Sequence, residues 1–150
     1  MTTDKTIVGW REWVTLPDLG IRDIKVKIDT GARTSALHAF DLKTFTEDGV
    51  KKIWFAIHPL QKRVDVVKEC IAEVLDQRWV SDSGGHREKR YVIRTNIALG
   101  DNLWPIEMTL TNRDNMKFRM LLGRTAMHDR LIVDPSASYL LGKRHKNKTI

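Results

Sequence analysis

The sequence predicts a mostly β protein whose strands close into a barrel. Short runs with an apolar residue at every second position recur along the 150 residues, and this alternation is typical of half-buried strands. Turn-forming residues separate the runs at intervals of about 8–12 residues, as in barrels and sandwiches. No internal repeat or low-complexity linker divides the chain. We therefore expect one domain over residues 1–150, with a core from about 7 to 142 and a basic tail from 143 to 150.

The first half of the chain contains three predicted strands. Ile7–Val14 and Ile21–Ile28 are separated by a turn at Pro17 and Gly20, two residue types that interrupt regular structure. Lys52–His58 alternates apolar and polar side chains and is closed by a proline. This half of the chain is therefore expected to contribute to a sheet.

The stretch Val64–Val80 is compatible with either a helix or a strand. Val67, Ile71 and Leu75 recur at a spacing that would form one stripe on a helix. Ile71, Leu75 and Trp79 would also share one face of an extended segment, in which alternate side chains point to the same side. Because the neighbouring segments are predicted strands, we favour a strand.

A hairpin is predicted in the second half of the chain. Its tip is Ser81–His86, where serine, aspartate and two glycines occur together. Arg90–Leu99 and Leu103–Thr111 are the next predicted strands, and Gly100–Asn102 forms the turn between them. Pro105 has no N–H to donate to a sheet, so its strand should lie at an edge or carry a bulge there.

The composition indicates a soluble, basic protein of the cytoplasm. Hydrophobic residues make up 41% and charged residues 30% of the chain, and the net charge is +7. No apolar run approaches 18 residues, and Met1–Thr6 lacks the apolar core of a signal peptide, so no membrane partner is expected. Cys70 is the only cysteine, which excludes an internal disulfide. The basic tail could contact RNA or an acidic protein, or it could be a solvated end.

A carboxylate directly follows the second predicted strand. Asp29 comes after Ile28, and Thr30 and Gly31 continue the loop. Functional side chains are often placed on loops at strand ends, and glycine allows the backbone to approach a ligand closely. The chain therefore presents Asp29 as a candidate catalytic residue.

Two motifs resemble the paired signature of the retropepsin-like aspartic proteases. Asp29–Ala32 reads Asp-Thr-Gly-Ala after an apolar strand, and Leu121–Arg124 reads apolar-apolar-Gly-Arg about 90 residues later. The longer stretches Lys27–Ala39 and Leu121–Ala126 are similar to a bacterial, RimB-like family labelled "ATP-dependent zinc proteases". Members of this family are often found beside the RimK-type ligase that adds glutamates to a ribosomal protein. The similarity covers nearly the whole chain.

The resemblance implies a closed acid-protease barrel with a short helix after Gly123 and Arg124. It also implies a homodimer, because an aspartic peptidase needs two close carboxylates that share one proton, and this chain has a single such motif. A water held between the two Asp29 carboxylates would then attack a peptide bond in a protein or peptide substrate. This chemistry needs no cofactor.

The resemblance also assigns roles to residues around Asp29. The catalytic loop would contain Asp29, Thr30 and Gly31, with Thr30 bonding across the dimer. The substrate would contact Ala32, Arg33 and a flap tip formed by Ser83, Gly84 and Gly85. The support beneath the catalytic loop would be Leu122, Gly123 and Arg124.

Arg33 departs from the retropepsin pattern, in which an acid follows the alanine and pairs with the arginine of the second motif. Two cations, Arg33 and Arg124, stand where that ion pair would be. We expect an acid such as Asp129 or Asp134 to hold Arg124 instead. Arg33 would then point into the substrate groove, where it would favour acidic or glutamylated substrates.

Two other functions remain open at this point. One is a non-catalytic β-barrel that binds an acidic protein or RNA through Arg33, Arg87, Lys89, Arg90 and the tail. The other is the zinc protease of the family label, with a site assembled from His38, His58 and His86. The sequence contains neither an HExxH zinc motif nor a GxxxxGK[ST] nucleotide-binding loop, so no metal or nucleotide is predicted.

Overall fold

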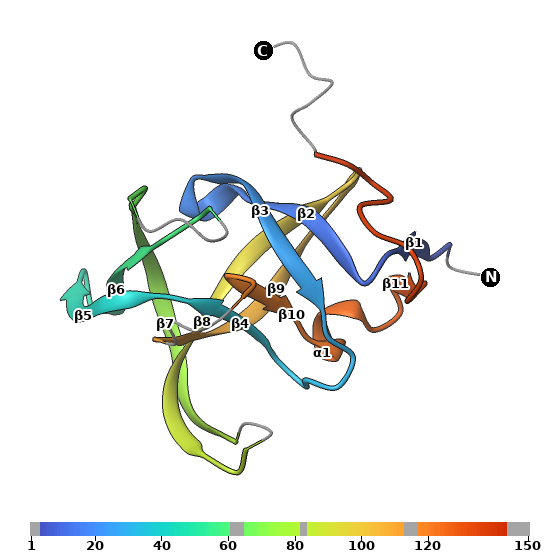
Figure 1. Ribbon diagram of the computed structural model, residues 1–150. Coiled ribbons are helices and arrows are strands. Elements are labelled where there is room, and N and C mark those ends of the chain that lie inside the picture. Colours follow the sequence, from blue (N-terminus) through green and yellow to red (C-terminus); the bar gives the residue numbers. More distant parts are fainter. Residues whose placement is uncertain (1–3, 61–64, 82–83, 113–116, 144–150) are drawn as a thin grey trace.

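The computed structural model describes residues 4–60, 65–81, 84–112 and 117–143, and their fold is mostly β (Figure 1). The strands of the first half are β1 Thr6–Val8, β2 Arg11–Leu16, β3 Ile21–Ile28, β4 Ser35–His38, β5 Phe40–Glu47 and β6 Val50–Ile57. Those of the second half are β7 Lys68–Ser81, β8 Arg87–Leu99, β9 Asn102–Thr111, β10 Met120–Leu122 and β11 Leu131–Val133. The helical elements are the 3-10 turn η1 Pro17–Leu19 and the short helix α1 Arg124–Met127.

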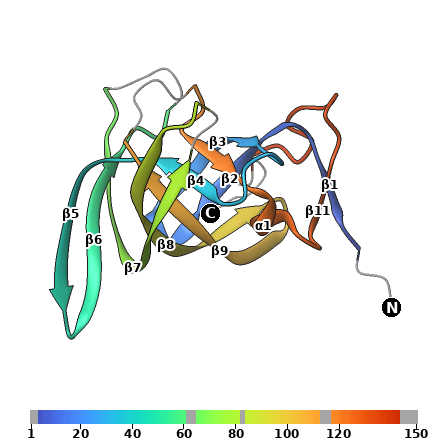
Figure 2. The ribbon, with the colours of Figure 1, turned by 90° about the horizontal axis from the view of Figure 1, so that it is seen from below.

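Six strands form a closed barrel, as the sequence predicts. Their order is β2-β3-β10-β4-β9-β8, and the pair Thr15 and Ala98 closes the ring between β2 and β8. Figures 1 and 2 show these strands wrapped around one interior, with α1 beside the end of β3. The short helix expected after Gly123 and Arg124 begins at Arg124, one residue earlier than the resemblance implies.

The short strand β10 brings the two sequence motifs together. It runs parallel to β3, with Leu122 beside Ile28, and antiparallel to β4, with Leu121 beside Ala36. The segment after Gly123 therefore starts next to the loop that begins at Asp29. Two stretches about 90 residues apart in the sequence meet at one end of the barrel.

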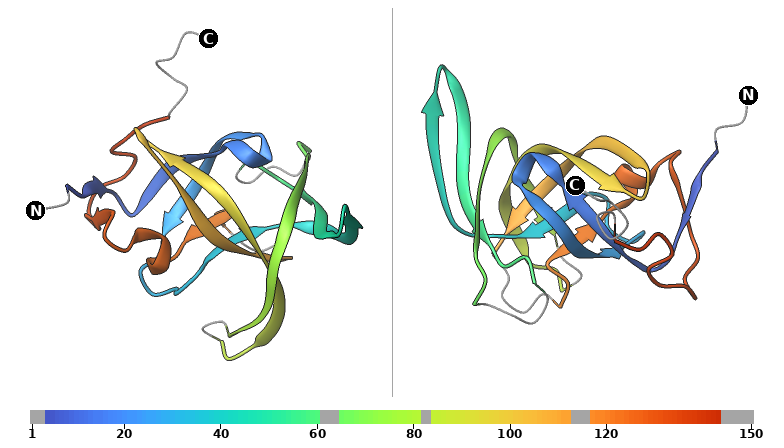
Figure 3. Two further views of the ribbon diagram at one scale, coloured as in Figure 1. Left: turned by 180° about the vertical axis from the view of Figure 1, so that it is seen from behind. Right: turned by 90° about the horizontal axis from the view of Figure 1, so that it is seen from above.

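Strands β5, β6 and β7 extend from the barrel as a wing, while β1 and β11 form a separate two-stranded sheet. The first part of β7 pairs with β6, and the second part, from Val74 to Ser81, pairs with β8, with an irregularity between Val74 and Asp76. The β5–β6 hairpin lies at the outer end of this wing (Figure 2). The β7–β8 hairpin projects from the barrel as a long arm (Figures 1 and 3).

The core follows from the alternation that predicts the strands. On β3, Ile24, Val26 and Ile28 are buried, while the lysines between them face outward. The same cluster takes in Phe55 from β6 and Met108 from β9. Each such side chain contributes about 1.5–3 kcal/mol on burial. The apolar face of β3 is therefore fixed in the barrel, and this fixes the position of the loop that follows it.

The prediction of one continuous strand over Ile7–Val14 is wrong. The chain breaks between β1 and β2 because the C-terminal segment crosses it at Gly9. A Cβ at Gly9 would lie 2.3 Å from the carbonyl oxygen of Ala137, and the Trp10 N–H donates to that oxygen at 2.9 Å. The residues around Gly9 do not predict this crossing, because its cause lies about 130 residues away in the sequence.

Two uncertain strand predictions are confirmed. The ambiguous stretch contains β7, so it is extended from Lys68 onward, and Val64 lies outside the described residues. Pro105 pairs with Asn96 on β8, but β4 joins β9 only from Met108 onward. Pro105 is therefore on an open edge of β9, where its missing N–H costs no sheet hydrogen bond.

No helix in the described part of the chain has the length and apolar character needed to cross a membrane.

The buried carboxylate of Glu12 fixes the C-terminal segment against β2. It accepts hydrogen bonds from the backbone N–H groups of Gly9 at 2.7 Å, Leu140 at 2.9 Å and Leu141 at 3.2 Å. These three hydrogen bonds to one buried side chain hold the segment up to Leu141 in place.

Candidate active site

Asp29 begins the loop between β3 and β4, and its position is fixed by the backbone. Its N–H donates to the carbonyl of Leu122 at 2.9 Å, and its carbonyl accepts from the Ala32 N–H at 3.2 Å. The Gly31 N–H donates to Asp29 Oδ1 at 3.1 Å. The loop therefore folds back on the carboxylate and leaves it partly exposed.

The second motif supports this loop from below. Arg124 N–H donates to the Ala32 carbonyl at 2.9 Å, and the backbone and hydroxyl of Thr125 donate to the Arg33 carbonyl at 3.1 and 2.9 Å. The Ser35 hydroxyl accepts from the Gly123 N–H at 3.0 Å. The residues that the resemblance assigns to loop support, Leu122, Gly123 and Arg124, are thus in contact with it.

Gly123 has no room for a side chain. A Cβ at this position would lie 2.6 Å from the carbonyl carbon of Thr34 and 2.9 Å from the carbonyl oxygen of Arg33. Both contacts are with backbone, which cannot rotate away as a side chain can. The glycine of the second motif is therefore required by the close approach of the two motifs.

Within the described residues, the predicted acidic partner of Arg124 is not found. Arg124 Nη1 donates to the carbonyl oxygens of Thr30 and Gly31 at 3.4 and 3.3 Å. Asp129 instead lies 3.2 Å from His128, and Asp134 accepts from the hydroxyl and N–H of Ser136. The expectation is wrong because loop carbonyls, rather than a carboxylate, satisfy the guanidinium.

A cavity of about 970 Å³ opens beside Asp29. Its lining includes four residues of the predicted site, namely Asp29, Gly31, Ala32 and Arg33. The opposite wall comes from the β7 arm and from strands β8 and β9, and it comprises Arg78, Trp79, Val80, Ser81, Arg90, Glu107, Thr109 and Thr111. Arg33 is exposed and lines the cavity, so its expected position in a groove agrees with the structure.

The predicted flap tip does not line this cavity in the described residues. β7 and β8 form a hairpin in which Ser81 pairs with Arg87, so the predicted hairpin is confirmed. Gly84 and Gly85 are exposed near its tip, and Ser83 lies outside the described residues. Thr30 is also exposed and does not line the cavity.

Sequence reasoning named Arg90 as a residue of the binding alternative, but it missed Arg78, Trp79 and Glu107 on the far wall of the cavity. Trp79 is 60% exposed on β7, and the guanidinium of Arg87 lies 5.1 Å from its ring. Arg90 is buried on β8, within 3.3 Å of Glu88 and 3.5 Å of the Thr109 hydroxyl. Arg90 begins the alternating run Arg90–Leu99, and a buried arginine has to be paired with polar groups. Its place in this run was therefore the signal in the sequence for a polar cavity wall.

Arg78 connects the arm to the barrel. It donates to Glu107 on β9 at 2.8 Å and to Asp76 on its own strand at 3.0 Å. The hydrogen bond from Arg78 holds the pKa of Asp76 below its ordinary value, and Glu107 followed by Asp76 raises the pKa of Arg78. Of these two hydrogen-bonded ion pairs, the one between Arg78 and Glu107 fastens the base of the arm to β9.

The zinc alternative does not fit the observed histidines. His38 and His58 stack with ring centroids 6.1 Å apart, and the Phe40 ring stacks on His58 at 4.5 Å. His86 lies in the turn before β8. Within the residues described by the structure, no three histidine, cysteine, aspartate or glutamate side chains gather as a metal site would require.

The closed barrel and the paired loop at Asp29 define a protein of the retropepsin-like class. β10, inserted between β3 and β4, holds the Asp-Thr-Gly loop against the Gly-Arg segment. A sequence profile described as "RimB-like: Retropepsin-like aspartic endopeptidase RimB" matches residues 7–144. The chain therefore belongs to the RimB-like family.

Curated relatives carry a different name. A "Probable alpha-L-glutamate ligase" of Shewanella pealeana is 45% identical over 144 residues, which is 96% of this chain and 31% of the relative. A protein of the same name from Parasynechococcus marenigrum is 51% identical over 140 residues, or 93% of this chain and 30% of the relative. The chain thus spans about a third of the length of these relatives.

A solved structure has the same fold. A protein of unknown function from Legionella pneumophila superposes with a TM-score of 0.78 at 28% sequence identity. The match covers 92% of this chain and 99% of that protein. The solved chain is therefore of nearly the same extent as this one.

Proposed function

We propose that this protein is a homodimeric aspartic peptidase in which Asp29 of each subunit activates the attacking water. The observation that supports the proposal is that the Asp29 carboxylate is held in place by its loop. Asp29 stands at the edge of a cavity of about 970 Å³, on a loop fastened through hydrogen bonds to Leu122, Arg124 and Thr125. Such a loop keeps a catalytic group in its reactive position.

The second carboxylate has to come from a partner. Among the described residues that line the cavity only Asp29 and Glu107 are acidic, and Glu107 is already bound to Arg78 at 2.8 Å. Two carboxylates in contact share one proton, so that one acts as base toward water and the other as acid toward the substrate. A second copy related by a two-fold axis would supply the missing Asp29.

Exposed groups offer a surface for the second copy. Thr30 is exposed on the loop that begins at Asp29, and in the proposed dimer it would bond with its symmetry mate. Ile7 on β1 and Ile132 on β11 are direct neighbours across a two-stranded sheet and are 54% and 51% exposed. This small sheet lies beside α1 in Figures 1 and 2, and an exposed apolar pair favours contact with another protein surface.

The substrate is proposed to be an acidic or glutamylated protein in the cytoplasm. The cavity that contains Asp29 is also lined by three arginines, Arg33, Arg78 and Arg90. Arginine binds carboxylates through paired hydrogen bonds. The relatives that contain a similar segment are named glutamate ligases, so a peptidase acting on glutamate-bearing protein would suit the same context.

Cleavage of peptides by wild-type and Asp29→Asn protein tests the proposal. Wild type should cleave within a panel of acidic and neutral peptides, and Asp29→Asn should lose at least about a thousandfold in rate with its circular dichroism unchanged. Asp101→Asn is the matched control, because Asp101 is exposed in the turn between β8 and β9. Equal cleavage by Asp29→Asn and wild type would refute the assignment.

Replacement of Arg33 tests the proposed preference. Arg33→Ala should lower kcat/KM on glutamate-rich peptides more than on neutral ones, since only the former lose a carboxylate partner. An equal effect on the two kinds of peptide would show that Arg33 does not select acidic substrates.

The same arginines favour one alternative, a non-catalytic module that binds an acidic protein. In that case Asp29→Asn would bind the acidic peptide as wild type does, and neither protein would cleave it. Sedimentation separates the two functions further, because the peptidase needs a dimer and the binding module works as a monomer.

A further inference from the structure

A second cavity, of about 440 Å³, continues from the one that contains Asp29. The two cavities share Arg33, Thr34, Arg78 and Glu107 in their walls. Four arginines line the second cavity, namely Arg33, Arg78, Arg94 and Arg130, and we call it the arginine groove. Its other walls include Trp104 and Thr125. A ligand that fills the first cavity can therefore extend into the arginine groove without leaving the protein surface.

The positive charge of the arginine groove is largely unbalanced. Among the described residues of its walls Glu107 is the only acidic one, and that carboxylate is bound by Arg78. Arg33, Arg94 and Arg130 form no ion pair with any residue in the described part of the chain. Three uncompensated guanidinium groups around one concave surface attract anions and repel one another until an anion is bound.

Arg130 is held in place by an aromatic support. Its guanidinium lies 5.2 Å from the ring centroid of Trp104, within the range of a cation–π contact. Trp104 is itself buried, and its indole N–H donates to the carbonyl of Ala126 at 3.0 Å. A cation resting on a fixed ring loses little conformational freedom when it binds an anion, so the groove is partly organised in advance.

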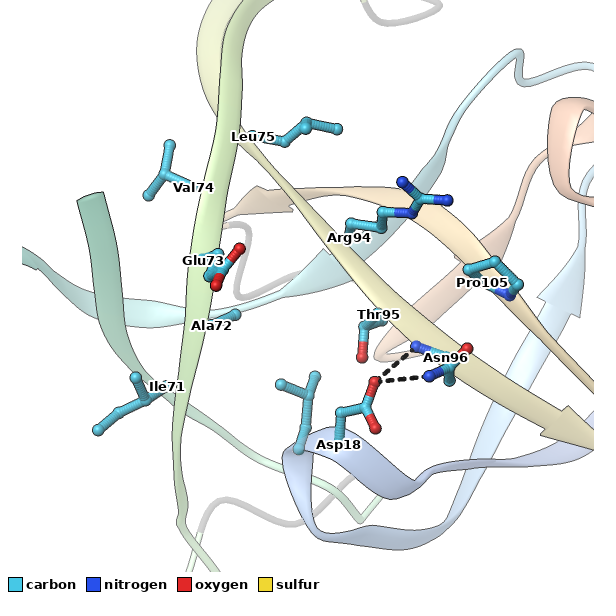
Figure 4. Close-up of a pocket in the computed structure, with 11 residues that line it drawn as sticks. Asp18, Ile71, Ala72, Glu73, Val74, Leu75, Arg94, Thr95, Asn96 and Pro105 are labelled. Carbon is cyan, nitrogen blue, oxygen red and sulfur yellow. Dashed lines mark hydrogen bonds between the residues drawn. The ribbon is translucent and has the colours of Figure 1, made fainter. Parts of the chain in front are cut away.

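Arg94 projects along the edge of β9. Figure 4 shows its side chain leaving β8 toward Pro105, away from Ile71 and Ala72 of β7. A third cavity, of about 440 Å³, lies on the β7 side, and there Asp18 accepts from both the N–H and the side-chain amide of Asn96. Arg94 and Pro105 line this third cavity as well as the arginine groove, so the side chain of Arg94 borders both.

The open edge of β9 limits how a peptide could bind in the arginine groove. Pro105 has no N–H, and β4 leaves β9 unpaired before Met108, so an added strand could not form a regular ladder at this edge. Recognition in the arginine groove must therefore come from side chains. Guanidinium groups bind carboxylates through two parallel hydrogen bonds, which a backbone carbonyl cannot match.

We propose that the arginine groove is an outer binding site for the carboxylate side chains of an acidic peptide whose scissile bond lies at Asp29. This inference rests on the proposed function for the identity of the ligand as a peptide. Arg94 and Arg130 are its determinants, because neither lines the cavity that contains Asp29. Substrates are then selected by acidic residues several positions away from the cleaved bond.

Binding of a labelled acidic decapeptide to the Asp29→Asn protein tests the groove without any need for cleavage. Arg94→Gln combined with Arg130→Gln should weaken binding by about tenfold, the loss expected for one or two charge-assisted hydrogen bonds. The control is Lys27→Gln combined with Lys43→Gln, which removes the same charge from exposed sites on β3 and β5 and should change binding less than about twofold.

Several outcomes would overturn the proposal. If Arg94→Gln with Arg130→Gln (the groove pair) loses no more affinity than Lys27→Gln with Lys43→Gln (the control pair), net charge alone attracts the peptide. Binding of a single-stranded RNA, but not of the peptide, through Arg94 and Arg130 would assign the groove to nucleic acid. Retention of full affinity by Arg94→Lys with Arg130→Lys would contradict the two-bond recognition, since lysine supplies charge without the planar fork.

Kinetics separate this inference from the proposed function. In protein that retains Asp29, Arg94→Gln combined with Arg130→Gln should raise KM for the acidic decapeptide about tenfold and leave kcat unchanged. If the binding loss is observed but neither protein cleaves, the groove is correct and the peptidase is wrong. If wild type cleaves and the groove pair leaves KM unchanged, the peptidase is correct and the groove is wrong.

Discussion

The Asp29 loop and the β7–β8 arm form two walls of the same cavity, but they are held very differently. The loop is joined to the segment after β10 by backbone hydrogen bonds from Asp29, Arg124 and Thr125, and Gly123 is packed directly against it. The outer part of the arm carries exposed side chains, with Trp79 60% exposed. One wall is fixed to the barrel, and the other is joined mainly at its base.

The difference indicates that the wall around Asp29 is rigid and that the wall formed by the arm is more loosely held. Local opening requires few contacts to break, and the arm beyond Arg78 has few buried side chains. The loop cannot move without separating β10 from β3 and β4. Substitutions in the loop should therefore change stability and activity together, whereas substitutions in the arm should change substrate binding alone.

The largest effect is expected from Gly123→Ala. Its methyl group would meet the backbone of Thr34 at 2.6 Å and push the two motifs apart, at a cost of about 3 kcal/mol. Thermal unfolding should shift down by roughly 10 °C, and peptidase activity should fall with it. Gly49→Ala is the control, because a Cβ there meets nothing within 4 Å and only its left-handed backbone is strained. Equal melting temperatures for the two variants would show that the loop is not tightly held.

A smaller loss is expected from Ser35→Ala. This change leaves the buried Gly123 N–H without the hydroxyl that accepts from it at 3.0 Å, which costs about 1–2 kcal/mol. Urea denaturation measures the loss as a lower midpoint with an unchanged slope. Thr44→Ala, at an exposed position on β5, should stay within about 0.5 kcal/mol of wild type. A wild-type midpoint for Ser35→Ala would exclude this contact as a support of the loop.

The arm should respond in the opposite way. Trp79→Ala should leave stability within about 0.5 kcal/mol of wild type, because the ring is mostly exposed. It should raise KM several-fold, since the ring lines the cavity and covers part of a bound peptide. Leu103→Ala, exposed on β9 and outside the cavity, is the control. A large fall in stability for Trp79→Ala would mean that the arm is as fixed as the loop.

The smallest expected effect is on the reactivity of the Cys70 thiol, which lies on β7 far from the tip of the arm. Burial raises the pKa of its thiol to about 11, and its Sγ lies 3.7 Å from the carbonyl of Leu19. The folded protein should react slowly with a thiol reagent at pH 8, since only the thiolate is nucleophilic. Burial favours the protonated thiol, so its contribution to stability should be present below pH 9 and decline as the pH rises toward 11. Rapid labelling of the native protein would show that this part of β7 opens.

The sequence predicts the strands well because their cause is local. The alternation in Ile21–Ile28 is enough to define β3, and the glycine-rich stretch after Ser81 is enough to mark a hairpin. The motifs at Asp29–Ala32 and Leu121–Arg124 are each local as well, and together they identify the family. These features depend on neighbours within a few residues of each other.

The features that the sequence does not predict depend on distant contacts. The break at Gly9 is imposed by Ala137, and the partners of Arg124 are carbonyls about 93 residues earlier in the chain. The arginine groove likewise collects residues from the Asp29 loop, β7, β8 and the segment after α1. No spacing in the sequence records such a gathering, because it is created by the closure of the barrel.

Mixing of wild-type and Asp29→Asn subunits tests the central claim most directly. At a fixed amount of wild type, a ninefold excess of Asp29→Asn should place most wild-type subunits in mixed dimers that have a single carboxylate. Activity should then fall to about one tenth, because random pairing leaves only that share of wild-type subunits with a wild-type partner. Activity that stays constant across the titration would show that one Asp29 is sufficient and would contradict the shared site.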